Sequence, residues 1–529
     1  MKKYLPLLLA ALSLPAWAQK SAVFYQSQGP AYQIPALSID SVKFSDGNSR
    51  ALFWLNGART ASYAVSSLDS ICFVADSKAD GFVAAAGIQS AVERAVLPSD
   101  VQAISVSEPI PSNENDAEYG DFFEYYTPET TVSITYSGNS ASYSGSLPKG
   151  VSVDISGAHV VVRSTKGKVR YRLQGSTSNG SFKIADMGED NKKLILELYG
   201  VSITNPMGAA INIQSGKAVY VKLQQGKDNY LKDGAVYVKT SGEDMKGAFF
   251  SEGQLLFSGA GTLSVTALGG HGICSDDYIR IRQNTGTITI KSAKDGFSTK
   301  DRFIMYGGNV VINSADEGIS VNKGDFRQYG GKLTVQTNSS KAHAVSAVGN
   351  IEVHGGLVDS HTGGAASKCL TSDSLVTVSG GFVRLVADGN PEFDAEKDDY
   401  STSACIKSAG GVTVSGGTLV LKNNGVAGKC INTDAWFSVS DASVAAWCTG
   451  ADFSQDAYSA RSRVVDAVNV TVGGSASVQL AGAKAAIHST GTIYINGGQA
   501  FAYTLEEGGK ALTGKPVLSQ SGGLLLWGE

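Results

Sequence analysis

The chain has few of the residues that build covalent or metal cross-links. Six cysteines and six histidines among 529 residues exclude a disulfide scaffold, and the absence of CxxC or Cys/His spacing argues against a zinc site. No HExxH, GxSxG or Walker A motif occurs, so no catalytic mechanism follows from a named motif. Beyond the first residues, no apolar run is long enough to span a bilayer.

Positive charge is also scarce. The first residues, MKKYLPLLLAALSLPAWA, place two lysines before an apolar run and end on a small-x-small pair, which is typical of a signal peptide over residues 1–18. We therefore expect an exported protein, in the periplasm, at the cell surface or outside the cell. Without those two lysines, 42 basic residues face 48 acidic ones. This balance argues against nucleic acid or an anionic membrane as partner.

Glycine is abundant, with 62 residues, and Ser, Thr and Val are frequent, which favours strands joined by tight turns. Residues 19–80 contain a duplication with an offset of 29 residues, which superposes Phe24 on Phe53 and Phe44 on Phe73. Each copy reads as a β-hairpin. The D-S-[IV]-x-F pairs resemble the short β segments that open many exported Bacteroidetes proteins. Such a head could attach the protein or cap the sheet that follows.

Residues 81–130 have no steady period and are interpreted as a linker. Ser90 and Glu93 have capping-box spacing and predict a short helix through Val96. The later stretch PIPSNENDAEYGDFFEYY is acidic and aromatic.

A ten-residue phrase then recurs, as in GICSDDYIRI from Gly272 and GFSTKDRFIM from Gly296. Its eighth and tenth positions are apolar, and its second position is apolar in every copy: Phe249, Ile273, Phe297, Ile319, Val345, Leu370, Ile406, Ile431 and Ile487. Most copies start 22 to 26 residues apart, and glycine pairs such as Gly307-Gly308 recur at matching places. Three short strands per repeat cannot bury their own apolar face, so the repeats must stack. The sequence therefore predicts an all-β parallel β-helix over residues 131–529, with about eleven or twelve coils.

Stacking would align the acidic residues at the corners of successive coils. One column contains His271, Asp295, Glu317 and His343, with Asp316 beside it, and another corner contains Glu252, Asp276, Asp277, Lys300 and Asp301. Carboxylates one coil apart repel each other unless they are solvated, protonated or bridged by a cation, and oxygen ligands suit Ca²⁺. The alternative is a set of ordinary solvated turn residues.

Position eleven of consecutive coils carries Arg282, Tyr306, Tyr329 and His354. By parity with the inward positions, these side chains point away from the core. They would form a platform for sugar rings or, alternatively, an aromatic ladder that only stabilises the sheet.

Cys369, Cys405 and Cys430 open three successive phrases, so they would stack at a distance that a disulfide tolerates. One pair could be oxidised, or all three could pack as small apolar groups. Cys72, Cys274 and Cys448 have no evident partner. Insertions around residues 390–400 and 451–460 are expected to form loops on one flank.

The motifs GEDMKG, FSEG and GICSDD, with GVSITNPMGAAINIQSGK upstream, resemble a family of exported carbohydrate-binding β-helix proteins. The resemblance covers most of residues 131–350. It implies a right-handed parallel β-helix similar to family 9 polysaccharide lyases, with bound calcium and adhesion to plant polymers. It favours Asp295, Asp316 and Glu317 as calcium ligands, Asp276, Asp277 and Asp301 as a second group, and Asp244 as a third candidate.

The leading hypothesis from the sequence is calcium-dependent, non-catalytic binding of an acidic or plant-type polysaccharide. The alternative is a pectate-type lyase, for which Lys294 and Lys300 are the nearest candidate bases, although neither lies in a catalytic lysine motif. A second alternative is a surface adhesin with a protein ligand.

Overall fold

The structure is a computed structural model. It describes six strands within residues 21–74 and then residues 88–89, 92–93, 95–113, 118–185, 193–506 and 508–528, with side chains from residue 88 onward apart from Leu526. The predicted signal peptide and Ser90 lie outside the described residues. Residues 88–89 and 92–93 are helical, but Ala95 and Val96 are not, so the helix ends earlier than expected.

The head forms two small antiparallel sheets, with strand orders β2-β1-β6 and β3-β4-β5. Its strands are β1 (Ser21–Gln26), β2 (Tyr32–Pro35), β3 (Ile39–Ser45), β4 (Arg50–Leu55), β5 (Ala58–Ala64) and β6 (Leu68–Val74). Each copy of the 29-residue duplication therefore has three strands, and its third strand pairs with the other copy. The prediction of two simple hairpins was incomplete because this exchange pairs strands that are not neighbours within one copy.

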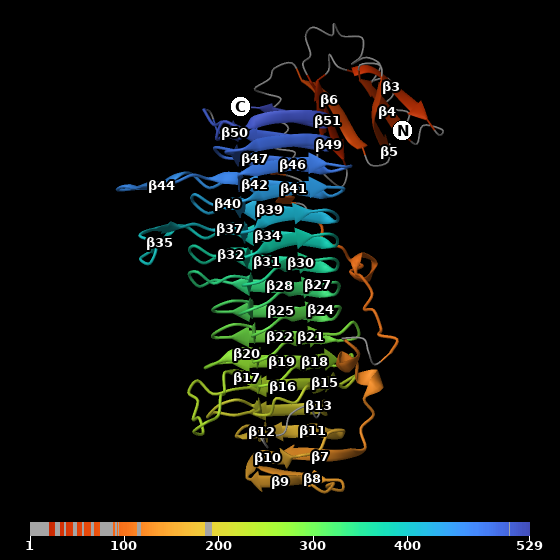
Figure 1. Cartoon of the computed structure of the whole chain (residues 1–529), viewed down its shortest axis with the longest axis vertical. Helices are drawn as coiled ribbons and strands as arrows, with labels where there is room; N and C mark the ends of the chain where they lie inside the picture. Colours follow the sequence, from red (N-terminus) through yellow and green to blue (C-terminus); the bar gives the residue numbers. More distant parts are fainter. Residues whose placement is uncertain are drawn as a thin grey trace.

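From Thr130 onward, the described residues form an all-β parallel solenoid of about 14 turns, seen with its axis vertical in Figure 1. One sheet, which we call sheet 1, takes one strand from each coil. Its order is β9 (Val151–Ser156), β10 (Ala158–Ser164), β12 (Gly180–Ile184), β14 (Ile211–Ile213), β17 (Gly247–Ser251), β20 (His271–Ser275), β23 (Phe297–Thr299), β26 (Ile319–Val321), β29 (Val345–Ala347), β32 (Lys368–Ser372), β37 (Ala404–Ser408), β40 (Lys429–Thr433), β45 (Arg463–Ala467), β48 (Ile487–Ser489) and β50 (Leu512–Thr513).

Two further ladders of parallel strands complete each coil. The first contains β15 (Val219–Leu223), β18 (Leu255–Ser258), β21 (Ile279–Ile281), β24 (Phe303–Met305), β27 (Phe326–Gln328), β30 (Ile351–Val353), β33 (Leu375–Val378), β38 (Gly411–Val414), β41 (Trp436–Ser440) and β46 (Asn469–Gly473). The second contains β16 (Asp228–Lys232), β19 (Thr262–Ala267), β22 (Thr287–Ser292), β25 (Asn309–Ser314), β28 (Lys332–Thr337), β31 (Leu357–Thr362), β34 (Phe382–Ala387), β39 (Thr418–Asn423), β42 (Ser443–Cys448) and β47 (Ser477–Gly482).

Long strands that run through both ladders form the coils at the two ends: β7 (Thr130–Ser137), β11 (Val169–Thr177) and β13 (Leu194–Thr204) at one end, and β49 (Thr492–Thr504) and β51 (Val517–Gly528) at the other. Near the first end, β8 (Ser140–Ser144) pairs antiparallel with β7, and β9 pairs antiparallel with β10. Because these terminal coils lack the ten-residue phrase, the sequence underestimated the number of coils.

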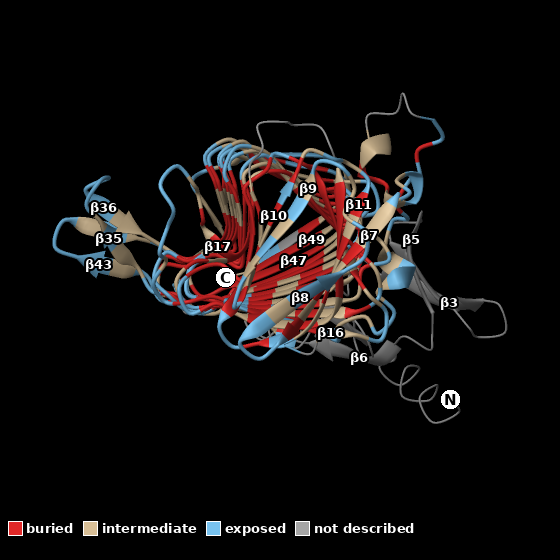
Figure 2. Ribbon diagram, turned by 90° about the horizontal axis from the view of Figure 1, so that it is seen from below, coloured by how far each residue is buried: buried red, intermediate tan, exposed pale blue. Residues whose placement is uncertain are grey.

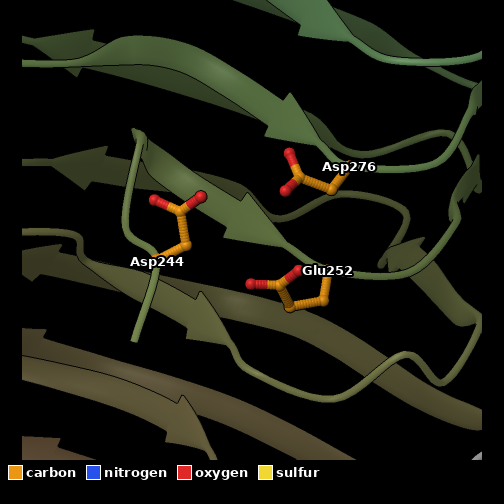
Figure 3. Close-up of side chains that lie close together, drawn as sticks. All are labelled: Asp244, Glu252 and Asp276. Atoms are coloured by element: carbon orange, nitrogen blue, oxygen red, sulfur yellow. The ribbon is translucent and has the colours of Figure 1, made fainter. Parts of the chain in front are cut away.

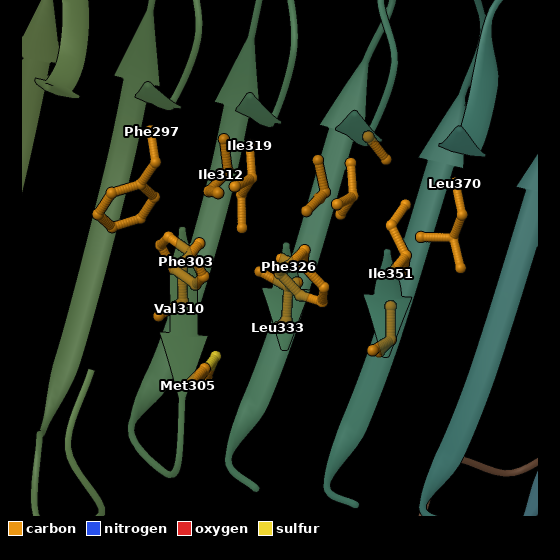
Figure 4. Packing of buried hydrophobic residues seen from close by; sticks show 14 of the residues in the cluster. Phe297, Phe303, Met305, Val310, Ile312, Ile319, Phe326, Leu333, Ile351 and Leu370 are labelled. Carbon is orange, nitrogen blue, oxygen red and sulfur yellow. The ribbon is translucent and has the colours of Figure 1, made fainter. Parts of the chain in front are cut away.

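The predicted inward positions stack as expected. In sheet 1, Phe297 pairs with Ile319 and Ile319 with Val345, and these side chains are fully buried. Neighbouring core residues interdigitate with them (Figure 4), and Phe303 stacks on Phe326 with ring centroids 5.7 Å apart. Viewed along the axis, buried residues line the interior of the coil (Figure 2). Apolar burial along the whole axis therefore stabilises the stack.

The glycine pairs let the chain turn between the two ladders. Gly331 has φ +74, and a Cβ at this position would lie 2.5 Å from the carbonyl carbon of Gly307 in the preceding coil. A larger residue would therefore strain the backbone and clash with the coil below.

The linker runs along the outside of the solenoid (Figure 1). We call its residues 101–113 and 118–126 the strap. The strap contains the short 3₁₀ helices η4 (Gln102–Ile104), η5 (Tyr119–Asp121) and η6 (Phe123–Tyr125). It contacts the turns of successive coils, since Gly356 donates to Ile104 and Val106 donates to Tyr329, both at 2.7 Å. A segment without periodicity is thus fixed to the flank of the repeats.

The two insertions form antiparallel hairpins that project from one flank (Figure 2). They are β35 (Glu392–Asp394) with β36 (Asp399–Ser401), and β43 (Phe453–Gln455) with β44 (Tyr458–Ala460). The hairpins contact each other through aromatic rings, because Tyr400 lies 4.7 Å from Phe453 between ring centroids. Within the described residues, no helix is long and apolar enough to cross a membrane.

Candidate functional site

Three carboxylates meet where two coils enter sheet 1. Asp295 lies two residues before the start of β23, and Asp316 and Glu317 lie just before β26. Because β23 and β26 are paired in parallel, carboxylate oxygens of all three residues come within 4.8 Å of one another. The structure thus brings together the first predicted group of metal ligands.

These three carboxylates have little local compensation for their charge. Asp295 is 5% exposed, and its Oδ2 lies 3.2 Å from Nδ1 of His271. Among the described residues, no lysine or arginine forms an ion pair with any of the three. Burial, and then the neighbouring Asp316 and Asp295, raise the pKa of Glu317 to about 8. A hard divalent cation would relieve this repulsion, so the donor set fits Ca²⁺.

A second cluster joins Asp244, Glu252 and Asp276, whose side chains converge from neighbouring coils (Figure 3). Here a lysine already supplies the positive charge. Nζ of Lys246 lies 2.7 Å from Asp244 Oδ2 and 2.6 Å from Asp276 Oδ2. Burial disfavours the ammonium, but the hydrogen bonds from its Nζ to both aspartates outweigh burial and raise the pKa of Lys246. This cluster is therefore a poorer fit to a metal ion than the first.

The structure separates Asp276 from the other members of its predicted group. Asp277 accepts a hydrogen bond from Gln254 instead, and burial followed by the charge of Asp301 raises its pKa. Both residues lie in the bend after β20, where Asp276 accepts hydrogen bonds from Lys246 while Asp277 faces Gln254. Within this predicted group, the structure thus brings Asp277 and Asp301 together and places Asp276 in the cluster of Asp244 and Glu252.

The two lysines considered as bases, Lys294 and Lys300, are both exposed. Lys294 precedes Asp295 directly, while Lys300 lies after β23. A lysine acts as a base near neutral pH when its side chain is buried and desolvated. Neither of these two side chains has such surroundings.

The predicted outward row forms a continuous stack. The ring of Tyr306 lies 4.4 Å from that of Tyr329, which lies 4.7 Å from that of His354, with interplanar angles of 6° and 16°. The strap covers one end of this row, since Arg282 is 4% and Tyr306 is 6% exposed. Only Tyr329 and His354 keep partial exposure, so Arg282 and Tyr306 are covered although they point away from the core.

The side chain of Arg282 binds residues of the strap. Its Nε lies 3.2 Å from Glu108 Oε2, and its Nη1 lies 2.6 Å from Glu124 Oε2. The guanidinium of Arg282 also lies over Phe122, 4.1 Å from the ring centroid. These contacts could not be predicted from the sequence. The strap is not periodic, so its residues cannot be aligned with particular coils.

Cys369, Cys405 and Cys430 lie in successive coils of sheet 1 and are buried free thiols. Cys405 donates to the carbonyl of Lys422 at 3.2 Å, and Cys430 donates to that of Trp447 at 3.4 Å. Cys448, which had no partner in the sequence analysis, lies beside Cys430. The neighbouring thiols are thus satisfied by backbone carbonyls and by one another.

Glu252 was placed from the sequence in the second acidic corner, but Lys246 was not assigned to a site. Lys246 belongs to the GEDMKG motif. The motif was considered only for the carboxylate of Asp244, and the positive charge of Lys246 was overlooked. Only the fold shows that this lysine turns back toward Asp276 of the next coil.

Comparison with known proteins finds relatives of this chain. A relative from Acetivibrio thermocellus (strain ATCC 27405), described as a carbohydrate-binding domain-containing protein, is 32% identical over 124 residues, which is 23% of this chain and 42% of that protein. The chain thus matches less than half the length of this relative. A solved structure of a polysaccharide lyase-like protein from C. thermocellum, a gadolinium derivative, is 25% identical with a TM-score of 0.41, covering 47% of this chain and 96% of that one.

The model of the family described as "carbohydrate-binding domain-containing protein" matches residues 156–452. This range includes both carboxylate clusters, the aromatic row and the first hairpin insertion. Because the match covers more than half of the chain, the protein belongs to the family of carbohydrate-binding domain-containing proteins.

Proposed function

We propose that the protein is a non-catalytic, calcium-dependent polysaccharide-binding protein that acts at or outside the cell envelope, with acidic or plant-type glycans as ligands. Family membership supports polysaccharide as the ligand class. The observation that carries the calcium dependence is the cluster of Asp295, Asp316 and Glu317, whose oxygens converge without a lysine or arginine partner among the described residues.

Calcium would be held by Asp295, Asp316 and Glu317. When bound, the ion would supply positive charge that a uronate carboxylate can share, which lets an anionic protein bind an anionic polymer. Asp295 is held by its burial, since it is 5% exposed, and Nδ1 of His271 lies 3.2 Å from its carboxylate. The chain's own residues therefore define the position of the charge before any ligand arrives.

The exposed part of the aromatic row supports a second contact with sugar. Tyr329 and His354 remain partly exposed and stack in parallel. His354 is held in place on both ring nitrogens, by Ser379 Oγ at 2.8 Å from Nδ1 and by Glu352 Oε2 at 3.1 Å from Nε2. A fixed flat surface of this kind can pack against the C–H face of a sugar ring at a low entropic cost.

The test measures retention of the full chain on a glycan array with calcium and with EDTA, together with calcium titration by calorimetry. We expect retention on acidic glycans that EDTA lowers strongly. Asp295→Asn and Glu317→Gln should each lower calcium affinity by about tenfold or more, because each removes a charged ligand. Asp276→Asn is the matched control, since Lys246 already neutralises that carboxylate, and it should leave calcium affinity nearly unchanged.

Four other outcomes would count against the proposal. Retention that does not respond to the chelator, or no retention on any polysaccharide, would contradict it. An unsaturated, ultraviolet-absorbing product from pectate that disappears in Lys294→Ala or Lys300→Ala would show a lyase instead. Binding to a protein that survives glycosidase treatment would show an adhesin with a protein ligand.

A further inference from the structure

Sheet 1 changes the sign of its charge along one row of residues. The row consists of the residue two positions before each inward-facing side chain, and in successive coils it reads Asp295, Glu317, His343, Lys368, Ala404, Lys429 and Arg463. The acidic end is the carboxylate cluster described above. The basic end lies at the base of the two projecting hairpins, where no function has been assigned.

Lys368 and Lys429 differ from the other cations around them. Lys407 pairs with Asp434 at 3.0 Å, Arg463 pairs with Asp466 at 2.7 Å, and Lys397 pairs with Asp394 at 3.2 Å. These three pairs use carboxylates that surround the row. Among the described residues, no carboxylate lies within ion-pair distance of Lys368 or Lys429.

The two ammonium groups have only neutral acceptors. Nζ of Lys368 donates to the carbonyl of Ala366 at 2.7 Å. Nζ of Lys429 donates to Oγ1 of Thr402 at 3.4 Å, a long contact to the segment that follows strand β36. Lys429 is only 9% exposed. A buried ammonium without an anionic partner costs stability, so it needs a compensating interaction.

The surroundings make this cost larger. Burial, and then the nearby charges of Lys397 and Lys407, lower the pKa of Lys368 to about 8. Burial also lowers the pKa of Lys429, with Arg463 and Lys407 acting in the same direction and Asp466 against it. Positive charge thus accumulates here, and the nearby carboxylates of Asp394 and Asp466 are already paired with Lys397 and Arg463.

We propose that Lys368 and Lys429 form a binding site for carboxylate groups of an acidic glycan, at the base of the hairpins on sheet 1. The two lysines are separated by two coils, or about 10 Å along the axis, so they would bind two different carboxylates of one polymer. The same row then recognises uronates in two ways, through calcium at its acidic end and directly at its basic end. This inference rests on the proposed polysaccharide ligand and adds a calcium-independent contact to it.

A purely structural role for the lysines gives a different expectation. If they served only to fill space, replacing either by methionine would change stability and leave glycan binding unaffected. In both cases the replacement removes an unpaired buried charge and should raise the melting temperature of the unliganded protein. Only if the lysines bind carboxylates should it also weaken the binding of acidic glycan.

The experiment compares the full chain with Lys368→Met, Lys429→Met and the double variant. Calorimetry with tetragalacturonate in saturating calcium should show at least about a tenfold loss of affinity in the double variant, because each lysine gives a charge-assisted hydrogen bond. Lys407→Met is the matched control, since it removes the same charge from the same sheet at a residue that already has a carboxylate partner. It should change affinity by less than about threefold.

A second measurement separates this inference from the proposed function. In EDTA, galacturonate should raise the melting temperature of the wild type and not that of the double variant. Equal shifts in both proteins, with unchanged tetragalacturonate affinity, would overturn the lysine site and leave the proposed function intact. If no polysaccharide binds but galacturonate still stabilises only the wild type, the proposed function fails while the anion site stands.

Discussion

Arg280 on strand β21 donates a hydrogen bond from Nε to Oε1 of Glu108 at 3.0 Å, although 172 residues separate them in the chain. The side chain of Arg280 has no exposed surface, and that of Glu108 is 3% exposed. Arg280 also lies 2.9 Å from Glu118 and 3.1 Å from Asp121. The strap is therefore attached to the solenoid by buried, hydrogen-bonded charge pairs, in addition to the backbone contacts at Ile104 and Val106.

Glu108→Ala should detach the strap, because it leaves Arg280 and Arg282 with fewer partners in a buried site. Breaking a buried pair in this way costs about 3 kcal/mol or more. The expected result is a lower midpoint of chemical denaturation and rapid proteolytic cleavage within residues 101–126, ahead of cleavage in the repeats. Glu124→Ala is the control, since that side chain is 51% exposed, and it should cost less than about 1 kcal/mol. Equal sensitivity of the two variants would contradict a buried anchor.

The repeats could be predicted from the sequence because each residue contacts the equivalent residue of the next repeat. Once Ile273, Phe297 and Ile319 are aligned, parallel stacking determines which residues become vertical neighbours. The same logic brought Asp295 and Glu317 together, since both lie at the same offset from an inward residue. A periodic sequence thus encodes both the core and the first carboxylate cluster.

Two features could not be predicted from the sequence, because neither depends on the repeat. They are the contact of the strap with the solenoid and the ion pair between Lys246 and Asp276. The strap reaches Arg280 from a segment with no period, so nothing in its own sequence specifies which coil it contacts. Lys246 belongs to a loop that turns back to Asp276 of the next coil, and loop direction is not encoded by hydrophobic pattern. The exchange of third strands in the head, β3 with β4 and β6 with β1, is missed for the same reason.

Lys246→Met should convert the second carboxylate cluster into a calcium-responsive one. Removing the ammonium leaves Asp244, Glu252 and Asp276 close together without a positive partner, and burial together with Asp276 and Asp244 already raises the pKa of Glu252. We expect a lower melting temperature in EDTA and a larger stabilisation by added calcium than in the wild type.

Lys239→Met is the matched control for this variant. Lys239 lies 3.8 Å from Asp244 and is 51% exposed, so its removal should leave both melting temperatures within about 1 °C of the wild type. Identical calcium responses in Lys246→Met and the wild type would show that geometry, and not the lysine, prevents this cluster from holding an ion.

The stacked cysteines should remain thiols in the native protein. Cys369, Cys405 and Cys430 are fully buried, so an alkylating reagent cannot reach their sulfur atoms in the folded protein. Mass spectrometry after treatment with iodoacetamide should find them unmodified under native conditions and fully alkylated in guanidinium. Disulfide-linked peptides recovered from non-reduced native protein would contradict this expectation.

Acid should destabilise the protein through His343. Burial, and then the charge of Lys368, lower the pKa of His343 to about 3 in the folded state, whereas an unfolded histidine titrates near 6.5. Between these two values the unfolded state binds more protons, so stability falls as the pH decreases from about 6.5 toward 3, with a limiting slope of about 1.4 kcal/mol per pH unit. Above pH 6.5 the contribution is constant.

His343→Asn isolates this effect from that of other titrating groups. Nδ1 of His343 accepts a hydrogen bond from the backbone N–H of Lys368 at 3.1 Å, and the side-chain oxygen of asparagine can accept the same bond without titrating. In EDTA, the stability difference between the wild type and His343→Asn, measured by denaturation at several pH values, should be constant above pH 6.5. Below that pH, the wild type should lose stability relative to His343→Asn. A stability difference that does not change with pH would mean that His343 is protonated in the folded protein as readily as in the unfolded chain.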